Sequence, residues 1–181
     1  MNLVDLANPR LDHGVHSYVA EFYTEHLVVQ ARLTSPEIRL SDHLNSSVST
    51  VDLRPLAVTQ RNGSQIDLSG SHAPVTKDRV LFVAPVSEPE RLRGASNAAW
   101  RQTTKHSCWV GMGGYSLSGT LHLESGRDPH ISMRMLDKQF LAATDVTVVA
   151  PDGVSRHFPA LLVNRLHIDL LALKNWHDVA G

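Results

Sequence analysis

Ser116 and Cys108 are the residues of this chain whose types would suit nucleophilic catalysis. Ser116 lies in the glycine-rich run 111–119, but a G-x-S-x-G nucleophile elbow needs a glycine where Ser118 stands. Cys108 follows His106 by two residues, whereas a thiol is activated by a base that is close in space, which spacing alone does not establish. The patterns favour a glycine-rich start of a strand and an incidental thiol. A hydrolase centred on Ser116 or Cys108 is therefore the least favoured hypothesis.

No metal or other cofactor is predicted. The chain has 11 histidines, but it contains no H-E-x-x-H motif and no cysteine cluster. His26, His122 and His157 fall on the polar sides of predicted strands, so scattered solvent-facing histidines are the expected arrangement.

Arginines outnumber lysines 13 to 4, and their best local cluster is Arg91, Arg93 and Arg101. These side chains would suit contacts to phosphate groups. The formal net charge is nevertheless -1 and only 6% of residues are aromatic, whereas surfaces for single-stranded nucleic acid combine basic and stacking side chains. Binding of a nucleic acid or nucleotide through these three arginines is therefore the second hypothesis.

Composition indicates a chain that can bury a core, since 42% of its 181 residues are hydrophobic. The lone cysteine cannot form an internal disulfide, which fits a reducing compartment. No run reaches the roughly 18 apolar residues that suit a membrane-spanning helix, and the first residues lack the pattern of a secretion signal. We therefore expect a cytoplasmic protein with no membrane insertion.

The elements that would position any site form a degenerate repeat. Residues 25–34 and 116–124 both alternate between apolar and polar side chains, which is typical of half-buried strands. Runs rich in β-branched residues follow at 51–60 and 141–150, again 90 residues apart. The pairs that carry the first match, at the same offset, are Leu27 with Leu117, Ala31 with Leu121 and Leu33 with Leu123.

A turn dipeptide closes each β-branched run, Asn62-Gly63 in the first copy and Asp152-Gly153 in the second. Such dipeptides are typical of type I′ hairpins, in which both central residues have positive φ. Each copy is thus expected to contain about five short strands in roughly 60 residues, which suits a small, strongly bent antiparallel barrel.

The predicted fold class is all-β, with two such barrels in tandem. Val19, Phe22 and Tyr23 have helical spacing, so the segment that contains them is interpreted as a loose arm with one helical turn. The expected organisation is an N-terminal arm (1–23), a first barrel (24–85), an irregular connector (86–113), a second barrel (114–173) and a C-terminal tail (174–181).

Residues 39–45 read R-L-S-D-H-L-N. This run resembles the R-L-S-D-x-L-N signature of an uncharacterised family of small bacterial β-domains. The residues that match it are Arg39, Leu40, Ser41, Asp42, Leu44 and Asn45. A closing segment, 77–80, has its counterpart at 164–168 in the second copy, and the strand order looks like that of Sm-like and SH3-like barrels. The resemblance implies a small barrel and carries no catalytic residue.

The favoured function is that of a non-enzymatic structural or assembly protein, which acts through protein–protein contacts as a subunit of a larger complex or oligomer. Small β-units with spare edge strands associate readily unless the edges are blunted. The side chains expected to contact partners are Phe22, Tyr23, Trp100, Trp109 and Trp176. An Sm-like nucleic-acid or nucleotide-binding module that uses the connector arginines is the alternative.

Overall fold

The computed structural model describes residues 15–68, 70–87, 103–126, 128–129, 131, 133 and 138–173. The first half contains β1 (His16–Thr24), β2 (Leu27–Ser35), α1 (Leu40–Leu44), β3 (Thr50–Gln60), β4 (Gln65–Ile66), β5 (Ala73–Thr76), the 3₁₀ turn η1 (Lys77–Arg79) and β6 (Val80–Ser87). The second half contains β7 (Thr103–Met112), β8 (Tyr115–Glu124), β9 (Phe140–Val149), β10 (Ser155–Asn164), the 3₁₀ turn η3 (Arg165–His167) and β11 (Leu170–Leu173). The fold is all-β, as the sequence predicts.

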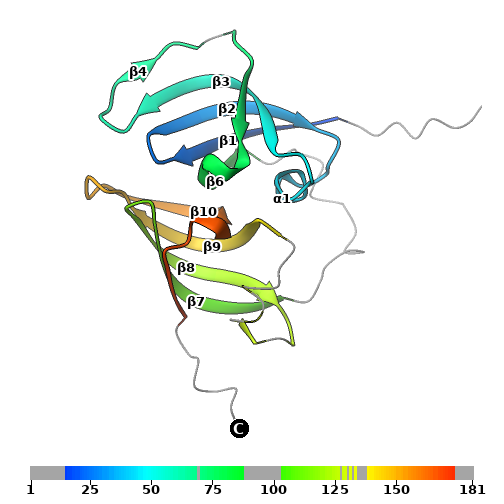
Figure 1. The fold of residues 1–181 in the computed structure, drawn as a ribbon, viewed down its shortest axis with the longest axis vertical. Helices are drawn as coiled ribbons and strands as arrows, with labels where there is room; N and C mark the ends of the chain where they lie inside the picture. The colour runs from blue at the N-terminus through cyan, green and yellow to red at the C-terminus, as the bar shows by residue number, and fades with distance from the viewer. Residues whose placement is uncertain are drawn as a thin grey trace, which may run out of the picture.

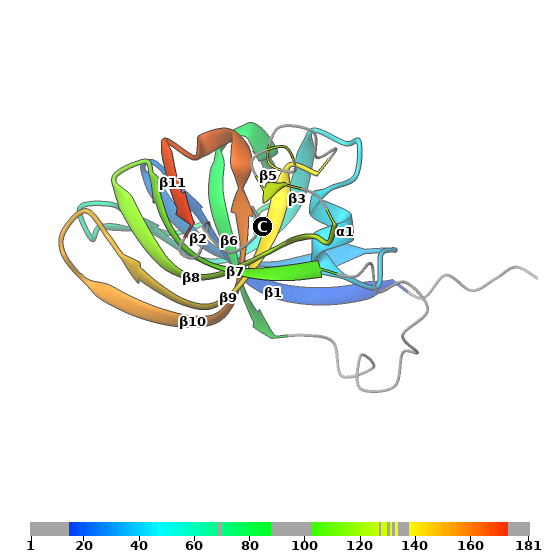
Figure 2. The same ribbon diagram turned by 90° about the horizontal axis from the view of Figure 1, so that it is seen from below.

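The strands of the described residues form one antiparallel sheet in the order β11-β7-β8-β9-β10-β6-β1-β2-β3-β4, with β5 also on β3. Figure 1 shows the first half stacked above the second, and Figure 2 shows that the strands of both halves are strongly curved. The predicted pair of closed barrels is not confirmed. Because β6 of the first half pairs with β10 of the second, both halves share a single open sheet.

Two predicted boundaries need correction, because each half has a strand that the sequence analysis assigned to a linker. Tyr18, Ala20 and Phe22 are buried at alternate positions of β1, which therefore lies within the predicted arm. The helical spacing of neighbouring apolar residues masked this alternation. Likewise, β7 (Thr103–Met112) lies within the predicted connector.

Strand pairing repeats between the halves with a nearly constant offset. Tyr23 of β1 pairs with Phe82 of β6, and their counterparts 88 residues further on, Gly111 and Leu170, also pair. The same offset relates the β1–β2 hairpin to the β7–β8 hairpin. The offset of 90 predicted for the first strand match is thus two residues too long, and an even slip keeps every side chain on its predicted face.

The offset becomes 90 at β3 and β9, as the sequence predicts for this pair of strands. Val58 pairs with Ile66, and Val148 pairs with Arg156. The counterpart of β4 and β5 together is the single strand β10, since the first half inserts a loop between its two short strands. Each half therefore has the same strand order, with the last strand beside the first.

A bulge interrupts the strand pairing at corresponding positions of the two halves. The β2–β3 register shifts after Gln30, and the β8–β9 register shifts between Ser118 and Thr120. In the second half Gly119 faces this bulge, where Asp145 has φ of 52°. A Cβ on Gly119 would lie 2.9 Å from Val146 Cγ2, 3.0 Å from Val146 Cα and 3.1 Å from Asp145 O. Only glycine fits this approach of two backbones without a shift.

We expect Gly119→Ala to lower the free energy of unfolding by about 2 kcal/mol, because the added methyl group meets backbone atoms that cannot rotate away. Urea denaturation of both proteins measures this difference. Ser118→Ala, at an exposed site on the same strand, is the control and should stay within about 0.5 kcal/mol. Equal denaturation midpoints for the wild type and Gly119→Ala would show that the bulge is absent.

The predicted turn dipeptides do close the β3–β4 and β9–β10 hairpins, but with a different geometry. Gly63 N donates to Gln60 O and Gly153 N donates to Ala150 O, each at 2.9 Å. Only the glycines have positive φ, 87° and 84°. The loops are therefore three-residue hairpins with a glycine bulge rather than type I′ turns. The Asn62 and Asp152 side chains instead accept hydrogen bonds from backbone N–H groups two residues on.

Side chains pack in two hydrophobic clusters, and each cluster draws on both halves. The cluster of the second half includes Tyr23, Leu81 and Phe82 from the first. The cluster of the first half includes Phe140 and Leu162 from the second. The halves therefore share their cores as well as their sheet, and this shared region is the junction considered next.

Candidate functional site

The junction between the halves is built on β6 and β10. Phe82 lies opposite Val163, and Val83 lies opposite Leu162, in an antiparallel pair. All four side chains are buried, with Phe82 and Val83 at 0% exposure. The last strand of the first half thus continues its sheet into the second half through the strand that precedes η3.

Asn164, at the end of β10, is fully buried and bonds to the backbone of η1 and of the first residue of β6. Its Nδ2 donates to Lys77 O at 3.2 Å and to Val80 O at 2.7 Å. Its Oδ1 accepts from Leu166 N at 3.1 Å. One side chain therefore satisfies backbone groups in both halves, which matters because unpaired polar groups in a buried site are costly.

The R-L-S-D-x-L-N run forms α1 and the residues at its ends. Leu40 and Leu44 point into the core. Asn45 ends the helix, where its Nδ2 donates to Ser41 O at 2.9 Å and to Phe140 O at 3.0 Å, while Phe140 N donates to its Oδ1 at 2.8 Å. The amide of Asn45 thus pairs with the start of β9 much as another strand would. Asn45 therefore links α1 of the first half to β9 of the second.

Lys77 of η1 is buried, at 2% exposure, and stabilises the end of α1. Its Nζ donates to Ser46 O at 3.0 Å and lies 3.3 Å from His43 O. Burial lowers the pKa of Lys77. The counterpart Arg165 in η3 donates from Nε to Lys138 O at 2.7 Å. In both halves, then, a cation on the 3₁₀ turn binds a carbonyl group of the segment that leads into the third strand.

An aromatic cluster lies beside the junction. Tyr23 stacks on Phe82 with ring centroids 4.3 Å apart, and Phe82 meets Tyr115 edge-on at 5.3 Å. Arg156 of β10 donates to Tyr23 Oη at 2.6 Å and forms an ion pair with Glu21 at 3.2 Å. Burial and the hydrogen bond to Glu21 raise the pKa of Tyr23. This arrangement ties β1 to β10 and keeps the tyrosine neutral.

These contacts correct one prediction about partner binding. Phe22 is fully buried and Tyr23 is 5% exposed, so neither side chain is free to contact another protein. Trp109 is half-buried on β7, with its ring against Gly111, and its role stays a prediction. The other predicted contacts, Trp100 and Trp176, and the arginines Arg91, Arg93 and Arg101 lie outside the described residues.

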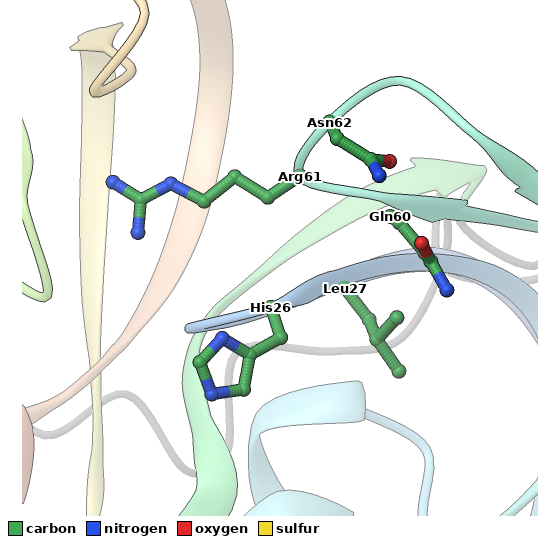
Figure 3. Close-up of a pocket in the computed structure, with 5 residues that line it drawn as sticks. All are labelled: His26, Leu27, Gln60, Arg61 and Asn62. Atoms are coloured by element: carbon green, nitrogen blue, oxygen red, sulfur yellow. The ribbon is translucent and has the colours of Figure 1, made fainter.

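A surface pocket of about 270 Å³ lies beside the β1–β2 and β3–β4 turns. It is lined by His26, Leu27, Gln60, Arg61 and Asn62. Its side chains do not converge: Figure 3 shows Arg61 extended toward the second half while Gln60 and Asn62 point the other way. The Arg61 guanidinium lies where a Cβ on Gly114 would meet it at 3.2 Å, and it lies 3.4 Å from Glu25 O. The pocket is smaller than most ligand sites, which exceed about 300 Å³.

The two nucleophile candidates are both on paired strands of the second half. Cys108 is 5% exposed, and burial raises the pKa of its thiol, which favours the less nucleophilic protonated form. Ser116 lies opposite Gly111 and Val149 in the sheet. Among the described residues there is no group of three or more His, Cys, Asp or Glu side chains that could hold a metal ion.

The two outer edges of the sheet are the candidate site that the sequence analysis did not name by residue. At one end is β11, where Leu170 is 60% exposed, and the neighbouring η3 has Leu166 at 57%. At the other end are β4 and β5, followed along the sheet by β3 with Leu56 at 52%. Sequence periodicity does not tell which strand is left at an edge.

We expect two half-buried histidines to make stability depend on pH. His43 Nδ1 lies 2.9 Å from Ser35 Oγ, and His122 Nε2 lies 2.9 Å from Thr144 Oγ1. Burial, followed by the nearby charges of Lys77 and Lys105 respectively, lowers both pKa values. The unfolded chain therefore binds more protons in mild acid. Stability should fall as the pH drops below about 6.5 and be fully regained above it.

Urea denaturation at about pH 7.5 and about pH 5.5 measures this loss. Replacing both histidines, His43→Gln with His122→Gln, should reduce the difference between the two conditions. The control His157→Gln, at an exposed position of β10, should leave it unchanged. Equal pH dependence in all three proteins would contradict the assignment.

Comparisons of the chain with protein-family models, with curated proteins and with solved structures found no match. No helix of the described residues is long and apolar enough to cross a membrane. The site must therefore be interpreted from this chain's own geometry.

Proposed function

We propose that the protein is a non-enzymatic assembly subunit, made of two copies of one five-stranded unit of Sm-like or SH3-like type, and that it acts in the cytoplasm through protein–protein contacts. The observation that carries this proposal is the state of the sheet edges. Strands β6 and β10 are paired with each other, whereas their counterparts β11 and β5 pair on one side only within the described residues. Unpaired edges with exposed apolar side chains are surfaces on which another strand can pair.

The polar side chains of the described region support the same role, because those that converge do so for structural reasons. Asn45, Lys77 and Asn164 bond to backbone groups, and Arg156 binds Glu21 and Tyr23. A polar side chain that already makes these bonds within the protein is not available to bind a substrate. What the described residues offer to other molecules is chiefly their edge strands and exposed leucines.

Light scattering on the full chain over a range of concentrations tests the assembly role. We expect masses above the 19.9 kDa of one chain, rising as the protein is concentrated. A constant monomer mass would overturn the proposal. Titration with RNA over a salt series distinguishes the alternative, since a nucleic-acid-binding module would show affinity that falls steeply as salt increases.

A further inference from the structure

We propose that β11 of one copy pairs antiparallel with β5 of a second copy, with Leu170 opposite Val75 and Leu171 opposite Pro74. This inference rests on the proposed assembly role and specifies its contact. The partner is therefore another copy of this chain, bound through two different edges of the same sheet.

The register follows from the internal junction. Phe82 and Val83 of β6 lie opposite Val163 and Leu162 of β10. Adding the offset of 88 to the β6 residues gives Leu170 and Leu171, the offset that also relates the β6–β1 pairing to the β11–β7 pairing.

Subtracting 88 from the β10 residues gives Val75 and Pro74 of β5. The pairings of β5 and β10 with their inner neighbours support this step. Val75 pairs with Val51 of β3, and Val163 pairs with Leu141 of β9, positions that differ by 88 and 90. Among the described strands, the edges left unpaired are thus the counterparts of the two strands that already pair.

The side chains that are buried at the β6–β10 junction have exposed counterparts at the edge strand β11. Phe82 is fully buried in the junction, whereas its counterpart Leu170 is 60% exposed. Asp78 of η1 accepts a hydrogen bond from Gln139 at 3.0 Å, and its carbonyl oxygen lies 2.6 Å from His167 Nε2, both across the junction. The counterpart of Asp78 is Leu166, 57% exposed. A second copy would cover both leucines.

The proposed contact should be weaker than the junction. Pro74 lacks an N–H group, and proline on an edge strand limits pairing with further strands. Thr76 stands where the junction has Asn164, and its shorter side chain cannot repeat the bonds of the amide. Because the two edges differ, repeated pairing adds copies head to tail, which gives a ring if the rotation closes and a filament if it does not.

Disulfide trapping tests the register directly. Leu170→Cys in one preparation and Val75→Cys in another are mixed and oxidised, so that a bond can form only between copies. Cys108 can stay, because it is buried. We expect a dimer on a non-reducing gel. The control Ala73→Cys in place of Val75→Cys should give little product. A shift of about 6.8 Å along the strand, combined with about 4.8 Å between strands, puts the two Cα atoms about 8 Å apart, and a disulfide spans at most about 7 Å.

Two outcomes would overturn the inference. The first is the absence of cross-linked dimer with the matched pair. The second is a monomer-sized disulfide when both cysteines are on one chain, with no product between chains, since this would show that the sheet closes within a single molecule. If light scattering still gives multimers in either case, the assembly role stands and only the contact is wrong. A strict monomer overturns both.

A charge at the same position provides an independent readout. Leu170→Asp should weaken self-association at least about tenfold, because the carboxylate would have to be desolvated in the contact. The matched control is Val154→Asp, at a residue that is 55% exposed beside the β9–β10 turn, and it should associate like the wild type. Near-ultraviolet circular dichroism checks that both variants fold. Equal weakening in both would show that the added charge acts without regard to position.

Discussion

Phe82→Ala is expected to lower the free energy of unfolding by about 4 kcal/mol, the range found when a buried phenylalanine is truncated. Phe82 is fully buried in the junction, stacks on Tyr23 and meets Tyr115 edge-on. The variant therefore loses apolar burial and two aromatic contacts, and it opens a cavity between the halves. Urea denaturation followed by tryptophan fluorescence measures the effect.

The control is the residue that occupies the same place in the second half. Leu170→Ala, at a position that is 60% exposed, should change stability by less than about 0.5 kcal/mol in dilute solution, as most surface substitutions do. Comparable losses at both positions would mean that β11 is as well covered in the monomer as β6. A small loss at Phe82 would mean that the junction does not form.

Asn164→Ala is expected to cost about 3 kcal/mol, because hydrogen bonds to three buried or half-buried backbone groups are lost. The amide contacts Lys77 O and Val80 O in the first half and Leu166 N in the second. Thermal denaturation should show a lower midpoint with one transition, since the two clusters each contain side chains of both halves.

Thr76 is the corresponding residue of the first half, and it is exposed at the end of β5. Thr76→Ala should therefore be close to neutral, within about 0.5 kcal/mol. If Asn164→Ala were equally neutral, the polar link across the junction would be unnecessary. If it produced two separate transitions, the halves would be independent folding units joined only by a weak contact.

Much of the fold can be predicted from local patterns. The β-branched runs 51–60 and 141–150 match β3 and β9 within one residue. The turn dipeptides at Asn62 and Asp152 lie at the ends of those strands. Side-chain alternation and turn chemistry depend on neighbours in sequence, and such features can be read directly from one chain.

The features that could not be predicted depend on contacts between distant residues. The bonds of Asn164 span 84 and 87 residues, and the β6–β10 pairing that prevents two separate barrels is equally remote. The strand β1 is hard to predict because the spacing of Val19, Phe22 and Tyr23 suits a helix as well as a strand. The candidate edges were missed for a related reason: a strand's sequence does not record how many of its sides are paired.

Amide hydrogen exchange on the full chain, compared between dilute and concentrated protein, tests the central claim most directly. We predict that the amides of Phe82, Val83, Leu162 and Val163 are protected at every concentration, because this pairing is internal. The amides of β11 that do not face β7 should gain protection only as the protein is concentrated. Unchanged protection of these β11 amides, in protein that light scattering shows to associate, would contradict pairing through these edges.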